Sequence, residues 1–202
     1  MGPIREALSA VPPALLADLK NRHTEPDRRY HDWTHIEALL GHLENAAPRI
    51  ENTQAVLYAI LFHDAVYDPR ASDNEQRSAE LLVQTATFLK RDTLTLAKRL
   101  IDATDGHALP GDLTGTALED CGHFLDMDLG ILGASEERFA IYEEQIRFEY
   151  RHVTPADYRI GRARVLRHFA DRDRLYFTAW GQDRFEAAAR TNLARSLAAL
   201  EG

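Results

Sequence analysis

The sequence predicts an all-α protein, and three observations support this fold class. Apolar residues recur at three- and four-residue spacing along almost the whole chain, which is the spacing of one helix face. No segment shows the apolar–polar alternation of a half-buried strand. Helix-breaking residues separate the periodic segments, at Pro48, Pro69, residues 106–115, Gly133 and Gly181. These patterns predict a bundle of helices joined by loops.

The predicted helices follow one another along the chain. In the first half they cover residues 3–21, 33–47, 53–67, 74–90 and 93–104. In the second half they cover residues 116–132, 135–151, 155–170, 174–180 and 183–200. Three of these helices have recognisable start signals, with Asp73 and Asp92 as N-caps and Thr154 followed by Pro155.

The size of the chain fits one domain. It has 202 residues, of which 45 % are hydrophobic and 28 % are charged, as in globular proteins with one apolar core. We therefore predict a single helical domain over residues 1–202, present as a monomer or a homodimer.

Charge and hydropathy narrow the classes of partner. The formal net charge of -8 opposes a phosphate backbone, so bulk nucleic acid is not an expected partner. Apolar runs fall short of the ~18 residues that a membrane-spanning helix needs, so no membrane association is expected. The N-terminal residues show no secretory pattern, and Cys121 is the only cysteine. We expect a cytoplasmic protein.

The first chemistry-bearing segment contains two histidines, His31 and His35. They are four residues apart, so on a helix they would share one face. Asp32 is a candidate cap for that helix, and in that case His31 lies on the turn just before it.

The second segment is the His63-Asp64 pair, which follows the apolar run of residues 55–61. Burying an unpaired carboxylate is costly, and a divalent cation removes that cost by neutralising it. Imidazole and carboxylate together suit Mn, Fe, Co, Ni, Zn or Mg. The alternative is that Asp64 is a cap or ion-pair partner and that His63 is a core histidine.

The third segment, residues 124–132, is an apolar stretch interrupted by Asp126 and Asp128. On a helix, Asp128 shares a face with apolar residues three and four positions away, whereas Asp126 lies about 200 degrees around the axis. We therefore predict that Asp128 faces the core. Either aspartate alone would more often be a cap or a surface ion pair, but three such insertions into apolar helices favour a metal site.

The order His, His-Asp, Asp on successive helices resembles the HD superfamily of metal-dependent phosphohydrolases. The similarity is closer to a bacterial family of predicted HD-type phosphohydrolases, and it spans nearly the whole chain. The segments that carry it are residues 29–36, 62–68, 74–79, 126–133, 146–150 and 158–162, with Tyr176 and Asn192. The resemblance implies an HD-domain-like helical bundle with a core at about 28–133 and C-terminal helices, 135–200, packed on it.

The resemblance also implies a ligand set. His35, His63, Asp64 and one of Asp126 or Asp128 would bind one divalent metal ion, and the helix-face argument favours Asp128. The opening Tyr-His-x-x-x-His is similar to the cyclic-nucleotide phosphodiesterase branch, in which the earlier histidine protonates the leaving oxygen. His31 thereby becomes the general-acid candidate.

The implied chemistry is hydrolysis of a small phosphate ester, with a nucleotide as the favoured substrate class. A divalent metal would make hydroxide from bound water, and Asp64 would steer that nucleophile. His31 would protonate the departing oxygen. Either a phosphomonoesterase or a phosphodiesterase fits this scheme.

Three further residues are candidates for the pocket. His107, near a predicted helix end, is expected to bind phosphate or a second metal, or else to interact with the helix dipole. Glu75 is expected beside the metal ligands, with helix capping as the alternative. Arg147 is the best candidate for contacting the substrate phosphate, although most arginines near it should form solvated ion pairs.

Two other functions remain as alternatives. One is an HD-type oxygenase that holds two irons, for which His107 is the obvious extra ligand. The other is a nucleotide-binding module without catalytic activity. The complete ligand set argues against a silent module, since degenerate members should lose ligands first.

Overall fold

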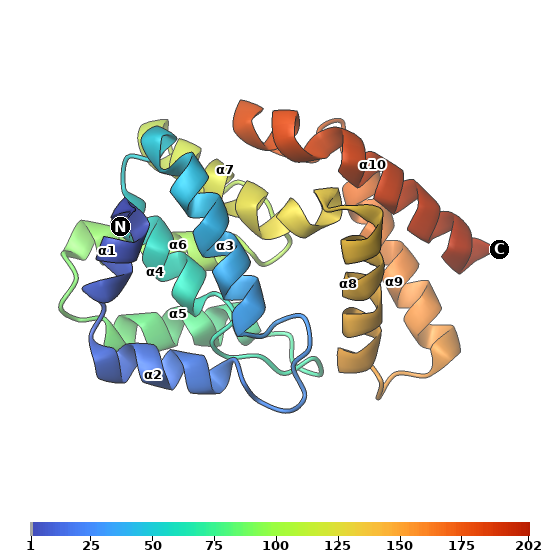
Figure 1. The fold of residues 1–202 in the computed structure, drawn as a ribbon, viewed down its shortest axis with the longest axis horizontal. Coiled ribbons are helices and arrows are strands. Elements are labelled where there is room, and N and C mark those ends of the chain that lie inside the picture. The colour runs from blue at the N-terminus through green and yellow to red at the C-terminus, as the bar shows by residue number, and fades with distance from the viewer. Residues whose placement is uncertain (1) are drawn as a thin grey trace. The chain divides into compact units, whose positions relative to one another are not determined.

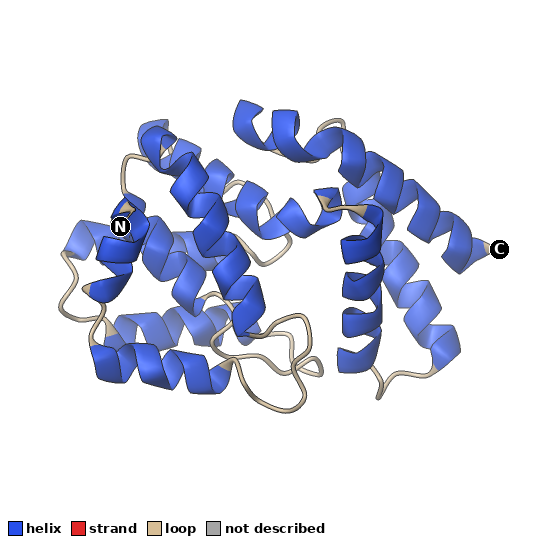
Figure 2. Ribbon diagram, viewed as in Figure 1, coloured by secondary structure: helices blue, strands red, loops and turns tan. Residues whose placement is uncertain are grey.

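The computed structural model describes residues 2–202, and every regular element in this range is a helix (Figure 2). The predicted all-α fold class is thereby confirmed. The chain divides into two compact units, Met1–Met127 and Asp128–Gly202. Residue 1, the first position of the predicted domain, lies outside the described residues. The single domain predicted over residues 1–202 stays a prediction.

The first unit is built around one central helix. Its helices are α1 (Pro3–Ser9), α2 (Pro13–Arg22), α3 (Trp33–Ala46), α4 (Thr53–Phe62), α5 (Asn74–Thr85), α6 (Arg91–Asp102) and α7 (Gly115–Asp128), with the 3₁₀ turn η1 (Ala47–Arg49) after α3. Helix α4 packs against α1, α3, α5 and α6 (Figure 1). Every residue from Ala55 to Phe62 is buried, because helices surround α4 on all sides.

Two N-cap side chains fix where α3 and α4 begin. The carboxylate of Asp32 accepts a hydrogen bond from the backbone N–H of Thr34 at 2.8 Å, as the sequence predicts. The side chain of Asn52 accepts one from the N–H of Ala55 at 3.0 Å. The buried carboxylate of Asp120, on α7, accepts from the N–H of Asn52 at 2.8 Å. Helix α4 is thus anchored to α7 as well as capped.

The second unit consists of the 3₁₀ turn η2 (Leu129–Gly133) and the helices α8 (Glu136–Glu149), α9 (Pro155–Ala170) and α10 (Ala179–Glu201). Helix α10 packs on α9 and on η2 (Figure 1). The Asn192 side chain donates hydrogen bonds to the carbonyls of Leu132 and Ala134 at 2.8 and 2.9 Å. The Tyr176 hydroxyl donates to the Leu129 carbonyl at 2.9 Å, so the backbone of η2 is bound from two directions.

Proline accounts for one departure from the predicted helices. The single helix predicted over residues 3–21 is two helices, α1 and α2. Pro12 is the N-cap of α2, with a non-helical ψ of 127°, and Pro13 occupies the first turn of α2. A proline ring fits the first turn of a helix but cannot continue a preceding one, since it has no N–H to donate.

Side-chain hydrogen bonds to the backbone account for other departures. Residues 174–178 of the predicted helix over 174–180 are not helical, because the N–H groups of Leu175 and Tyr176 donate to the carboxylate of Glu186. Helix α10 begins only at Ala179, after the cap Thr178. Asp73 is the N-cap residue of α5, as predicted, but its side chain makes no capping hydrogen bond. The capping role predicted for Asp92 was wrong, because Lys90 is the N-cap and Asp92 lies inside the first turn of α6. Thr154 does cap α9.

Among the described residues, no helix is both long enough and apolar enough to cross a bilayer.

Candidate metal centre

Three potential metal ligands converge in the first unit: His35, His63 and Asp64. Their ligand atoms lie within 4.8 Å of one another. The His63 Nε2 atom is 3.2 Å from His35 Nε2 and 3.1 Å from Asp64 Oδ2, and His35 Nε2 is 3.8 Å from that oxygen. The fold therefore brings together two histidines that are 28 residues apart in the chain.

The buried end of α4 positions two of these groups. His63 is the C-cap of α4, and its N–H still donates to the Ala59 carbonyl at 2.9 Å. The predicted helix over residues 53–67 therefore ends early, at Phe62. The chain turns there because the N–H of Val66 bonds to the hydroxyl of Ser78, on α5, rather than to the helix. This turn directs Asp64 towards the histidines.

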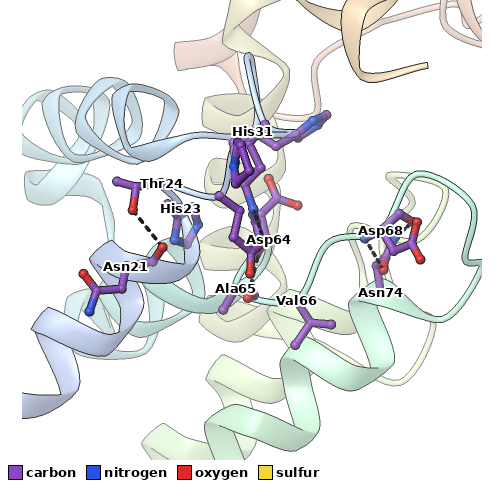
Figure 3. Close-up of polar contacts among 12 residues, drawn as sticks. Asn21, His23, Thr24, His31, Asp64, Ala65, Val66, Asp68 and Asn74 are labelled. Atoms are coloured by element: carbon purple, nitrogen blue, oxygen red, sulfur yellow. Dashed lines mark hydrogen bonds and ion pairs between the residues drawn. The ribbon is translucent and has the colours of Figure 1, made fainter. Parts of the chain in front are cut away.

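A second contact with α5 holds the far side of the same turn. Asp68 and Asn74 form a reciprocal pair, in which the Asp68 N–H donates to the Asn74 side chain and the Asn74 amide donates to the Asp68 carbonyl (Figure 3). The bonds are 3.0 and 2.9 Å long. Residues 63–68 are thus fixed to the start of α5, which limits the freedom of the Asp64 carboxylate.

The hydrogen bond of His63 to the backbone determines which ring nitrogen can bind a cation. Its Nδ1 atom lies 3.0 Å from the carbonyl of Ile60. A carbonyl can only accept, so Nδ1 must carry the proton, and in the neutral ring Nε2 presents a lone pair. That lone pair faces the Asp64 carboxylate and the Nε2 atom of His35. A divalent cation among the three groups would relieve the repulsion, so the donor set fits a metal ion.

Charge and burial act in opposite directions on Asp64. Burial would raise the pKa of its carboxyl group, but the electrostatic influence of the neighbouring His63, His31 and His35 imidazoles outweighs burial and holds the pKa well below its usual range. Both ligand histidines are buried, whereas the Asp64 side chain is 19 % exposed. The carboxylate is therefore the member of the group that solvent can reach.

His31 lies on the loop before α3, as the sequence predicts if Asp32 caps that helix. Its ring packs against the ring of Tyr67 in a tilted arrangement, with centroids 4.4 Å apart and planes inclined by 31°. Its charge contributes to the low pKa of Asp64, and Figure 3 shows the two side chains close together. The half-buried imidazole thus stands beside the ligand group.

The burial of the two late aspartates corrects the helix-face prediction. Asp126 is completely buried, whereas Asp128, which begins the second unit, is half-buried. The face argument failed because all of residues 120–127 are buried, so α7 has no exposed face there. Neither aspartate belongs to the group of three converging ligand atoms. A fourth ligand from this pair stays a prediction.

The remaining site candidates lie on three different elements. Glu75 is half-buried in the first turn of α5, directly after Asn74. His107 follows α6 in a left-handed conformation, with φ of 49°, and is not part of the ligand group. Arg147, at the end of α8, donates to the carbonyls of Tyr150 and Val153.

The contacts of Arg147 give its guanidinium a structural role at the end of α8. It also lies 4.6 Å from the centroid of the Tyr158 ring. Contacts of Glu75, His107 and Arg147 with a substrate stay predictions.

Two buried residues near the site were missed by sequence reasoning. Arg28 is buried and donates to the carbonyl of Asp64 at 2.6 Å. His23 is completely buried, and its Nδ1 donates to the Leu19 carbonyl at 2.8 Å. Both lie in a charged segment that reads as solvent-exposed, and the only available signal was their proximity to His31 in the chain.

Comparison with known proteins adds no identification. No protein-family model, no curated protein and no solved structure matches this chain.

Proposed function

We propose that this chain is a metal-dependent phosphohydrolase of the HD type that acts on a small phosphate ester, with a nucleotide as the favoured substrate class. One observation carries the proposal: two buried imidazoles and one partly exposed carboxylate converge within 4.8 Å. His35, His63 and Asp64 would hold one divalent cation, and few protein ligands leave positions for water and phosphate.

The roles of the individual residues follow from their environments. A bound divalent cation would supply a Lewis acid for the phosphoryl oxygen and lower the pKa of water. The Asp64 carboxylate, which solvent reaches, accepts a hydrogen bond from the attacking water and orients it. His31 is not among the converging ligands, so its imidazole can carry the proton to the leaving oxygen.

The test is metal-dependent turnover of generic esters. The protein loaded with Mn²⁺ or Co²⁺ should hydrolyse p-nitrophenyl phosphate or bis(p-nitrophenyl) phosphate, which distinguishes a monoesterase from a diesterase. Asp64→Asn should abolish this turnover. Asp120→Asn is the matched control, because it also changes a buried carboxylate to an amide but does so at the anchor of α4.

The outcome separates the alternatives. Equal rates in the parent and Asp64→Asn would mean that this group is not the source of the activity. Binding of a nucleotide without turnover by the metal-loaded protein would favour the silent binding module. Two irons per chain with charge-transfer absorption would favour the oxygenase.

A further inference from the structure

The buried guanidinium of Arg28 connects two loops that carry site residues. Arg28 lies on the loop between α2 and α3, and its side chain is only 2 % exposed. A buried cation is costly unless its donors are paired. Its carboxylate partner is Glu25, at 3.1 Å, and that side chain is 53 % exposed. Because solvent surrounds the Glu25 carboxylate, this ion pair contributes little, so the other partners must account for the burial of Arg28.

Those other partners are backbone carbonyls of the site itself. The Nη1 atom donates to the carbonyl of Asp64 at 2.6 Å and to the carbonyl of His31 at 3.1 Å. The Nη2 atom is 3.4 Å from the carbonyl of Ala65. The planar guanidinium of Arg28 therefore joins the backbone of His31, the candidate proton donor, to the backbone of Asp64, which supplies the carboxylate.

Aromatic contacts add a second connection between the same loops. The Arg28 guanidinium lies 5.4 Å from the centroid of the Tyr67 ring, and the His31 imidazole packs against that ring with centroids 4.4 Å apart. Arg28 thus contacts the backbone of His31 directly and supports the ring against which the His31 side chain packs. Lysine could not replace it, because an ammonium group has neither the planar fork nor the flat face for stacking.

We propose that Arg28 is a positioning residue that sets the placement of His31 relative to Asp64. This inference rests on the proposed function, in which these two residues act on the same phosphate. Hydrogen-bond partners of metal-ligating residues fix the orientation of the ligands, and their loss lowers metal affinity by about 10–100-fold. The proton donor must also be placed closely, since a displacement of about 1 Å can cost about 100-fold in rate.

The experiment compares Arg28→Gln and Arg28→Lys with Arg29→Gln. Arg29 is exposed, and its Nη1 atom donates to the carbonyls of Pro26 and Arg28, inside the same loop. Co²⁺ affinity is measured by calorimetry, the Co²⁺ site by its visible absorption, and helical content by circular dichroism. Both Arg28 variants should lose about 10–100-fold in Co²⁺ affinity with unchanged helical content. Arg29→Gln should keep the parent affinity and spectrum.

A crystal structure of each Arg28 variant gives a readout that needs no metal. The His31 loop should move relative to Asp64 by about 1 Å or more, enough to matter for proton transfer. If both loops keep the parent positions, the inference about Arg28 is overturned even when the parent binds metal and is active. If the parent binds no Co²⁺ but the loops move, the proposed function fails and the positioning role stands. Should Arg28→Gln not fold, Arg28→Lys, which keeps the charge, carries the same comparison.

Discussion

Buried His23 should make the stability of the protein depend on pH. Its imidazole is completely buried, Nδ1 is bonded to the Leu19 carbonyl, and Nε2 has no hydrogen-bond partner among the described residues. Burial lowers the pKa of His23 from 6.5 to about 4, with a smaller contribution from the charge of Arg28. The folded protein therefore resists protonation that the unfolded chain accepts.

The sign and size of the effect follow from this shift. Because the folded pKa is the lower one, the contribution is fully present above pH 6.5 and is lost as the pH falls towards 4. Each pKa unit corresponds to about 1.4 kcal/mol, so the loss between pH 7 and pH 4 is about 3 kcal/mol. That is a large part of the roughly 5–15 kcal/mol that stabilises a typical domain.

The assay is urea denaturation of the parent and His23→Asn at several pH values from 7 to 4. The asparagine amide can donate to the Leu19 carbonyl in place of Nδ1 but does not titrate. Other histidines titrate in both proteins, so their contributions cancel in the difference. The parent should lose about 3 kcal/mol more than the variant over this range. Parallel stability curves for the two proteins would refute the reasoning.

Two further predictions concern the fourth ligand and the packing of α10. Asp126→Asn should lower Co²⁺ affinity, measured by calorimetry, more than Asp128→Asn does, because Asp126 is completely buried in the unit that holds the three candidate ligands. A larger loss in Asp128→Asn would instead support Asp128 as the ligand, as the helix-face argument predicts. Gly133→Ala should lower the free energy of unfolding by about 1–3 kcal/mol, since a Cβ there would lie 2.8 Å from the Phe185 backbone. Gly161→Ala, with nothing within 4 Å, should instead stabilise α9 by up to about 1 kcal/mol, and equal unfolding midpoints for these two variants would contradict the packing account.

Part of the candidate site could be predicted from the residues alone. His63 and Asp64 follow a strongly apolar helical segment, and the end of a buried helix is a place where such polar groups must find partners. The addition of His35 rested on the family resemblance, and in the structure its Nε2 atom lies 3.2 Å from His63 Nε2. The continuous burial of α4 also follows from its unbroken apolar run. In these cases local pattern and tertiary packing agree.

The errors arose where packing overrides local pattern. Helix periodicity places Asp126 and Asp128 on different faces of α7. However, every residue from 120 to 127 is buried, so the face of a residue does not decide whether it is buried there. The start of the helix expected at residues 174–180 does not form, because the carboxylate of Glu186, which lies later in the chain, accepts hydrogen bonds from the N–H groups of Leu175 and Tyr176. Arg28 has the sequence context of a solvated charge, and its burial is explained by the carbonyls of His31, Asp64 and Ala65, two of which belong to a distant loop.

Metal binding by the parent and His63→Ala tests the central claim most directly. Each protein is incubated with Co²⁺ and dialysed, and its metal content and visible absorption are then measured. The account predicts one tightly held ion per chain in the parent, with the absorption of a Co²⁺–imidazole site. It predicts no such ion in His63→Ala at unchanged helical content. A parent that holds no Co²⁺, or a His63→Ala variant that holds as much as the parent, would contradict the account.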